Sequence, residues 1–83
     1  MTDTLSTDDA DILYFLSEAS HFVTWRVAEA VRRGPRAVRK DLVALDKRGL
    51  VNACGPAPTT WRRTRAGSAA LKAAQERLRH DHP

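Results

Sequence analysis

The sequence predicts a mostly α-helical domain with one small β-hairpin, in the order α-α-α-β-β-α. Four segments carry apolar residues at helical spacing, and Gly34-Pro35 marks a tight turn between the second and the third. Residues 59–63 are rich in β-forming types and follow a Pro/Ala loop. With 83 residues the chain holds a single domain, which we place at residues 8–79 between a loose tail at 1–7 and a frayed end at 80–83.

The first helix is expected over about residues 8–20. Its apolar residues recur at helical spacing, in Ile12, Leu13, Leu16 and Ala19. Ser6 or Thr7 can cap the amino end, where negative charge is favourable, here from Asp8, Asp9 and Asp11. We expect these acids to face away from any nucleic acid, because phosphates repel like charge. Residues 21–23 form a short extended link to the next helix.

The second and third helices form a pair joined by a tight turn. Thr24 is the expected N-cap of a helix over residues 25–32, whose inner face is Val27, Ala28 and Val31. Because the residue before a proline is pushed out of helical space, this helix should end by Arg33. Gly34 can take unusual dihedral angles, and Pro35 suits the first position of the next helix, where its missing N–H costs nothing.

The third helix is expected over residues 35–48, with Gly49 as its C-terminal cap and a core stripe of Val38, Leu42 and Leu45. The hairpin follows as a strand at 50–53, a loop tip at 55–58 and a return strand at 59–63. Thr64 then caps a last helix over residues 65–79. The apolar positions of that helix are Leu71, Ala74 and Leu78.

Charge is unevenly distributed along the chain. Residues 1–20 carry −5, residues 24–51 carry +5 and residues 59–83 carry +4, which gives the net charge of +4. A basic region of this kind is the electrostatic footprint expected of a nucleic-acid binder. A solvated basic surface without a ligand has the same composition, so charge alone leaves both readings open.

The composition also disfavours several functions. No apolar run approaches the roughly 20 residues of a membrane span, and the acidic amino end does not resemble a signal peptide. The single cysteine, Cys54, fits a reducing, cytoplasmic setting. There is no Gly-rich phosphate loop and no Ser/His/Asp set, and His80 with His82 makes an incomplete metal site. We therefore expect no enzyme activity, no metal and no cofactor.

Four side chains lie opposite the core stripe of the third helix, near its amino end: Arg36, Arg39, Lys40 and Val43. The planar fork of an arginine pairs with guanine in a major groove, so we predict base contacts from Arg36 and Arg39. Lys40, a point charge, is predicted to contact a phosphate. Further contacts with the DNA backbone are expected from flanking residues: Thr24, Trp25, Arg32, Arg33, Arg62 and Arg63.

Plainer roles stay open for some of these features. Trp25 can pack on the domain as readily as it contacts a phosphate, because indole has one donor and much apolar area. Trp61 is favoured as an anchor of the hairpin over a base-stacking residue. Cys54 is favoured as an inert thiol over a redox sensor. The apolar side of the last helix, at Leu71, Ala74 and Leu78, serves either a homodimer, which we favour, or packing on the first helix.

This order of elements resembles the winged helix-turn-helix repressors of the MarR-like kind and of small archaeal and phage regulators. The resemblance rests on the apolar pattern of three helices and on Arg48-Gly49-Leu50-Val51, which enters the hairpin. Residues 61–67 are similar to the family's tyrosine-x-leucine-threonine-x-x-glycine exit from the hairpin, called the wing. Arg63 departs from this pattern, since the family has leucine there, and we expect it to face solvent or DNA instead of the core.

The resemblance, which covers about residues 10–75, implies a sequence-specific transcriptional regulator that binds duplex DNA, with repression as the family's common mode. A homodimer and a cytoplasmic, nucleoid-associated location fit this reading. The long flanking helices of full-size family members are absent, so we expect no small-molecule effector. Two other roles stay open, namely a winged-helix protein–protein module and a protein that coats DNA or RNA without sequence preference.

Overall fold

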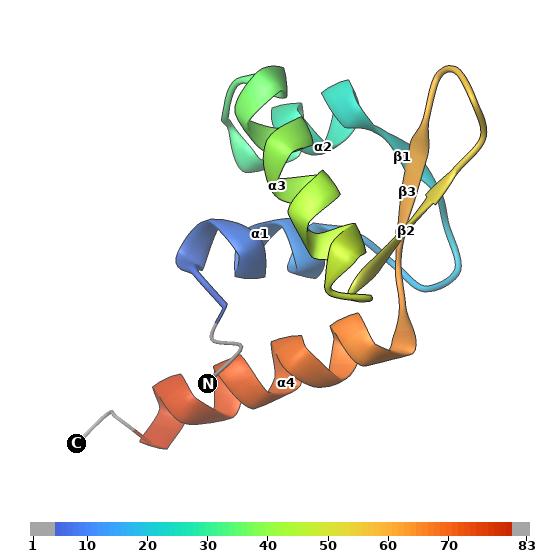
Figure 1. Cartoon of the computed structure of the whole chain (residues 1–83). Helices are drawn as coiled ribbons and strands as arrows, with labels where there is room; N and C mark the ends of the chain where they lie inside the picture. The colour runs from blue at the N-terminus through green and yellow to red at the C-terminus, as the bar shows by residue number, and fades with distance from the viewer. Residues whose placement is uncertain (1–4, 81–83) are drawn as a thin grey trace.

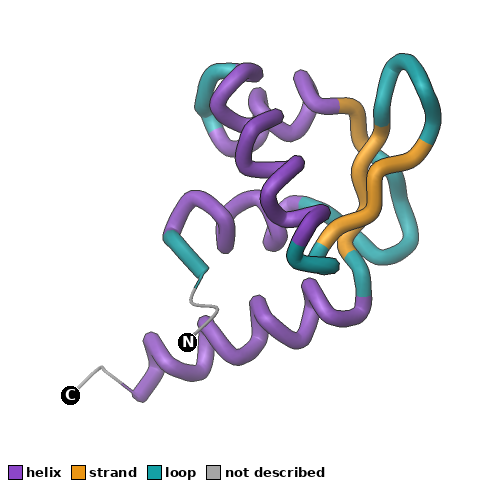
Figure 2. The backbone as a smooth tube through the Cα atoms, in the orientation of Figure 1, coloured by secondary structure: helices purple, strands orange, loops and turns teal. Residues whose placement is uncertain are grey.

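The computed structural model describes residues 5–80, with side chains as far as Arg77. Three helices precede a β-hairpin, and a fourth helix follows it (Figures 1 and 2). In chain order the elements are α1 (Thr7–Phe15), β1 (Phe22–Val23), α2 (Thr24–Val31), α3 (Pro35–Lys47), β2 (Val51–Cys54), β3 (Thr60–Arg63) and α4 (Arg65–His80). The predicted order of elements is confirmed, with one short strand added before α2.

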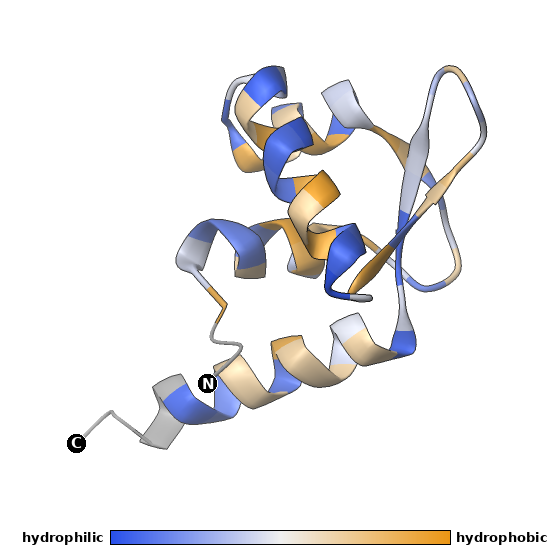
Figure 3. Cartoon of the chain, in the orientation of Figure 1, coloured by the Kyte–Doolittle hydropathy of each residue, from blue (hydrophilic) through white to orange (hydrophobic). Residues whose placement is uncertain are grey.

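A single apolar core lies where α1, α2 and α3 meet the sheet. The core stripe predicted for α3 is confirmed, because Val38, Leu42 and Leu45 are fully buried. The other buried side chains come from the remaining helices, from the hairpin and from residues next to these elements: Ile12, Leu13, Leu16, Val27, Ala28, Leu50, Val51, Trp61 and Leu71. In Figure 3 the first and last turns of α3 are coloured hydrophilic, and more hydrophobic residues lie between them. None of the described helices is long and apolar enough to cross a membrane.

The first helix is shorter than predicted, since it ends at Phe15 instead of near residue 20. Leu16 is already extended, with φ −69° and ψ 161°. The chain leaves the helix there because its backbone is used by the sheet: the carbonyl of Ser17 accepts a hydrogen bond from the Arg63 N–H at 3.0 Å. At the other end the predicted cap is confirmed, because Ser6 Oγ accepts from the Asp9 N–H at 3.0 Å.

The extended link becomes an edge strand of a three-stranded sheet with the order β1-β3-β2. Val23 pairs with Thr60, and Val23 is also the N-cap residue of α2. The prediction of Thr24 as the N-cap was therefore wrong, because Thr24 is the first helical residue and makes no capping hydrogen bond. Its hydroxyl instead accepts a hydrogen bond from the indole N–H of Trp61 at 2.8 Å, a contact that the strand pairing brings about.

In the turn between α2 and α3 the unusual dihedral angles fall on Arg32 and not, as expected, on Gly34. Arg32 is left-handed, with φ 59° and ψ 46°, whereas Gly34 is ordinary extended backbone, with φ −64° and ψ 143°. Because a proline favours extended backbone in the residue before it, Gly34 is confined to that region and the left-handed turn falls on Arg32. The predicted end of α2 before Arg33 and the start of α3 at Pro35 are both confirmed.

The hairpin and α4 follow the predicted bounds within one or two residues. Thr64 caps α4 as predicted, since its hydroxyl oxygen accepts from the Gly67 N–H at 3.0 Å. Gly67 lies so close to Leu50, the residue before β2, that a Cβ there would overlap the Leu50 carbonyl oxygen. This glycine therefore allows the first turn of α4 to pack against the start of the wing.

Candidate nucleic-acid interface

The outer face of α3 presents Arg36, Arg39 and Lys40 to solvent. This follows from helical spacing, because Val38, Leu42 and Leu45 turn the opposite face into the core. Val43, on the same outer face, is 36% exposed. Among the described residues no acid or carbonyl pairs with these three cations, so their charge is available to a ligand.

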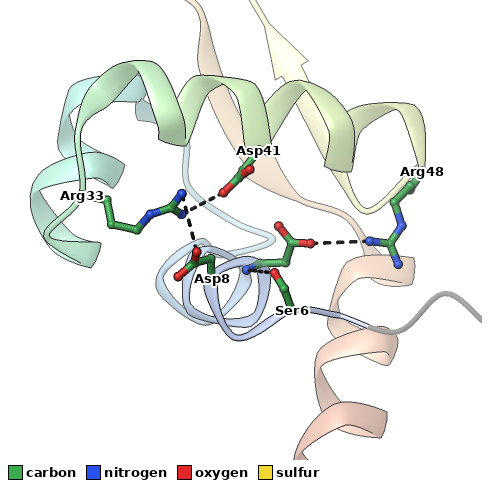
Figure 4. Close-up of polar contacts among 6 residues, drawn as sticks. Ser6, Asp8, Arg33, Asp41 and Arg48 are labelled. Carbon is green, nitrogen blue, oxygen red and sulfur yellow. Dashed lines mark hydrogen bonds and ion pairs between the residues drawn. The ribbon is translucent and has the colours of Figure 1, made fainter.

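The side of α3 that faces α1 has a different electrostatic arrangement (Figure 4). The Arg33 guanidinium lies 2.8 Å from the Asp41 carboxylate of α3 and 3.7 Å from that of Asp8 in α1. The hydrogen bond to Asp41 raises the pKa of Arg33, with further support from the charge of the same carboxylate. Arg33, which we predicted to meet phosphates, is therefore held between two helices of its own chain.

A second ion pair joins the same helices, with Arg48 Nη1 lying 3.7 Å from an Asp9 carboxylate oxygen. Burial raises the pKa of Asp9, and the charge of nearby Asp41 raises it further, whereas Ser6 and Arg48 lower it. The net direction shows that the surroundings of Asp9 disfavour its charged form. Two acids of α1, Asp8 and Asp9, thus face arginines of the domain.

The two wing arginines lie at the base of the hairpin and point into the domain. Arg63 Nη1 donates to the Leu13 carbonyl at 2.7 Å, and Arg62 Nη1 donates to the Glu18 carbonyl at 3.3 Å. The expectation that Arg63 faces solvent or DNA was wrong. Because α1 ends early, the Leu13 carbonyl lacks the partner that a further helical turn would supply, and Arg63 fills that place. Both side chains are half-buried, and their Nε atoms are buried without a partner among the described residues.

The two tryptophans have opposite environments. Trp61 is only 2% exposed, which confirms it as an anchor of the wing in the core. Trp25, in the first turn of α2, is 60% exposed and so does not pack inside the domain. Arg32 is exposed at the left-handed turn on the other end of α2.

The remaining predicted positions lie away from α3. Leu71 is buried and Ala74 half-buried on α4, and both line a surface hollow beside Tyr14 of α1, while the side chain of Leu78 lies outside the described residues. Cys54 is half-buried. The described residues contain no group of three histidine, cysteine, aspartate or glutamate side chains that could hold a metal ion, and the side chains of His80 and His82 are not among them.

No protein-family model matches this sequence, and no curated protein matches it. Solved structures do resemble it. A MarR family transcriptional regulator from Silicibacter pomeroyi DSS-3 is 21% identical over 92% of this chain and 56% of its own, with a TM-score of 0.75. A probable transcriptional regulator from Pseudomonas aeruginosa is 20% identical over 92% of this chain and 60% of its own, with a TM-score of 0.79.

ZitR, a zinc-responsive MarR family member from Lactococcus lactis, is 24% identical over 93% of this chain and 58% of its own, with a TM-score of 0.72. The chain thus spans between 56% and 60% of the length of these three structures. At such identities the likeness concerns the fold. Together with the observed order of elements, it shows that this chain has the winged helix-turn-helix fold found in MarR-family transcriptional regulators.

Proposed function

We propose that this protein is a sequence-specific transcriptional regulator, acting as a repressor, that binds duplex DNA through α3. The observation that carries the proposal is the set of three exposed cations without internal partners, Arg36, Arg39 and Lys40, on the outer face of α3. An α-helix fits the major groove of B-form DNA, and an outer face of this kind is suited to meet base edges and phosphates. The likeness to structures of transcriptional regulators supports the same reading.

In this proposal Arg36 and Arg39 contact bases, because a guanidinium donates two parallel hydrogen bonds to the O6 and N7 atoms of guanine. Lys40, a compact charge one residue farther along the exposed face, contacts a phosphate. Phosphate contacts fix the position of the protein on the duplex, whereas base contacts select the sequence. Loss of an arginine and loss of the lysine should therefore have different consequences.

The flanking contacts come from both ends of α2. Arg32, at the carboxyl end of α2, is exposed and meets the DNA backbone, and Trp25, exposed in the first turn of α2, meets it from the other end. The Thr24 hydroxyl accepts a hydrogen bond from Trp61 but keeps its own hydrogen for donation to a phosphate. Internal contacts hold the remaining predicted contact residues, Arg33, Arg62 and Arg63, so in our proposal they support the domain.

We also propose that two copies associate through the side of α4 that carries Ala74 and Leu78, next to Leu71, which is buried in its own domain, and that they place two α3 helices on two half-sites. Sedimentation at high micromolar concentration would show a monomer if this proposal is wrong.

Two of the similar structures are described with an effector, NadR with 4-hydroxyphenylacetate and ZitR as zinc-responsive. That this chain takes no small-molecule effector and acts at the nucleoid in the cytoplasm stays a prediction.

The function is tested by titrating the protein against its own upstream promoter DNA and a scrambled duplex at two salt concentrations. We expect roughly a thousandfold preference for the promoter and a steep fall of affinity with salt. Equal, salt-sensitive binding to both duplexes would instead indicate a coating protein or a distant operator. An absence of binding to either duplex would favour the protein–protein module.

A further inference from the structure

A hollow of about 410 Å³ lies between the start of α2, the outer face of α3 and the tip of the wing. The wing tip and the first turn of α2 rise at the same end of the molecule (Figure 1). Its lining includes Thr24, Trp25, Arg39, Pro56, Ala57 and Pro58. Its volume is in the range of about 300–1,000 Å³ that is typical of sites for small organic groups. One sugar-phosphate unit of a nucleic acid is such a group.

The walls of this hollow have an unusual combination of chemistry. The indole of Trp25 and the Pro56-Ala57-Pro58 tip form two apolar sides, and Arg39 supplies a positive charge. No acidic residue lines the hollow. Trp25 is the most exposed of the chain's two tryptophans, at 60%, although burial of so large an apolar surface is favourable. This side chain is therefore poised to be covered by a ligand.

A DNA strand alternates an apolar deoxyribose with an anionic phosphate, and this alternation matches the two kinds of wall. We propose that the hollow seats one sugar-phosphate strand of the duplex, with a deoxyribose packed between Trp25 and the wing tip. The positive charge of Arg39, which lines the hollow from α3, attracts the adjacent phosphate at longer range, while its guanidinium keeps the base contact proposed above. This inference rests on the proposed function and specifies how the wing takes part in it.

The wing then acts through shape and apolar contact. Residues 55–58 at its tip, Gly-Pro-Ala-Pro, contain no cation. The two wing arginines, Arg62 and Arg63, lie at its base and donate to carbonyls of the domain. A wing with this distribution cannot attract phosphates by charge at its tip, but it can close one side of an apolar slot opposite Trp25.

Trp25 reports directly on whether the hollow is filled. The chain has two tryptophans, and Trp61 is 2% exposed, so acrylamide quenching of the fluorescence comes mainly from Trp25. With saturating promoter duplex, verified by anisotropy of a labelled strand, we expect quenching of the wild-type protein to fall severalfold. The variant W25F, which keeps only Trp61, should show weak quenching that DNA does not change.

The wing tip is tested with an introduced carboxylate. A57D places a negative charge at the wall of the hollow and should weaken DNA binding about tenfold or more, because it repels the strand. The matched control is A66D, the same substitution at an exposed position in the first turn of α4, away from the hollow. A66D should bind like the wild type, and thermal unfolding of both variants shows whether the fold is intact.

Protection of Trp25 together with the loss in A57D would support the slot. Two results would contradict the seating of a DNA strand in the hollow while leaving the proposed function intact. One is a Trp25 that acrylamide still quenches fully when DNA is saturating, and the other is equal DNA affinity of A57D and A66D. A protein that binds no duplex at all would remove the proposed function, and this inference with it.

Discussion

Arginines on α3 and at its two ends have opposite surroundings on the two sides of the helix. On the outer side, Arg36 and Arg39 are exposed and have no ion-pair partner among the described residues. On the side toward α1, Arg33 and Arg48 contact Asp41, Asp8 and Asp9. The same residue type therefore has two uses, as a charge offered to a ligand and as a link between helices.

The difference shows that a count of positive charges overstates the binding surface. Between residues 24 and 51 the sequence carries eight basic residues, but ion pairs with acids of α1 and α3 hold two of them, Arg33 and Arg48. Arg62 and Arg63 in the wing donate to backbone carbonyls in the same way. The division of the arginines into those available to DNA and those held inside the domain is therefore tested by variants whose DNA affinity and folding stability are measured separately.

The largest effect is expected for Arg39→Ala on DNA binding. Loss of a base contact should cost about 1–3 kcal/mol of binding free energy and relax specificity, with the melting temperature unchanged. The control is Lys47→Ala, since Lys47 is another exposed cation, in the last turn of α3, and its loss should cost much less. Affinities measured by anisotropy would contradict the face assignment if both variants lost the same amount.

Arg63→Ala is expected to show the reverse pattern. Because Arg63 Nη1 satisfies the Leu13 carbonyl, its removal should lower the free energy of unfolding by about 1–2 kcal/mol. DNA affinity, measured at a temperature where the variant is folded, should change little. Arg65→Ala is a nearby comparison, because Arg65 is exposed and should stay within about 0.5 kcal/mol of the wild type.

Arg33→Ala decides between the two roles considered for this residue. If the contacts with Asp41 and Asp8 are its function, the variant should unfold at lower denaturant concentration and keep its DNA affinity and salt dependence. Lys40→Ala provides the contrast, because loss of a phosphate contact should reduce the salt slope by about 1. An equal reduction of the salt slope in Arg33→Ala would show that Arg33 contacts the DNA.

The smallest effect concerns Asp9 and has an unusual sign. Its native pKa is raised above the ordinary value of 3.8, so the folded protein holds this proton more tightly than the unfolded chain does. The stability of the wild type relative to Asp9→Asn should therefore be greatest below pH 3.8 and fall as the pH rises through the native pKa. Denaturant titrations of both proteins from about pH 3 to about pH 7 measure this difference. A rise with pH would mean that the ion pair with Arg48 outweighs burial.

Helical periodicity made much of the fold predictable. Val38, Leu42 and Leu45 recur four and three residues apart, and that spacing alone placed them in the core and turned Arg36, Arg39 and Lys40 outward. The end of α2 and the start of α3 were likewise predictable, because a proline acts on its own neighbours in the chain. These are local effects, and local effects can be read along a sequence.

The errors share a different cause. The early end of α1, the role of Thr24 and the direction of Arg63 all depend on partners far away in the sequence: Ser17 with Arg63, Thr24 with Trp61, and Arg63 with Leu13. The hollow beside Trp25 similarly joins three elements that are separate along the chain.

By itself, then, the sequence determined the order of elements, the core stripe and the cations that α3 offers to solvent. Only the tertiary structure decided which of the other arginines remain available, since their partners are carboxylates and carbonyls that packing brings within hydrogen-bond or ion-pair distance. The physical reason is that helical spacing is set by neighbours along the chain, whereas the pairing of a long, flexible guanidinium is set by whichever acceptor the folded domain places within its reach.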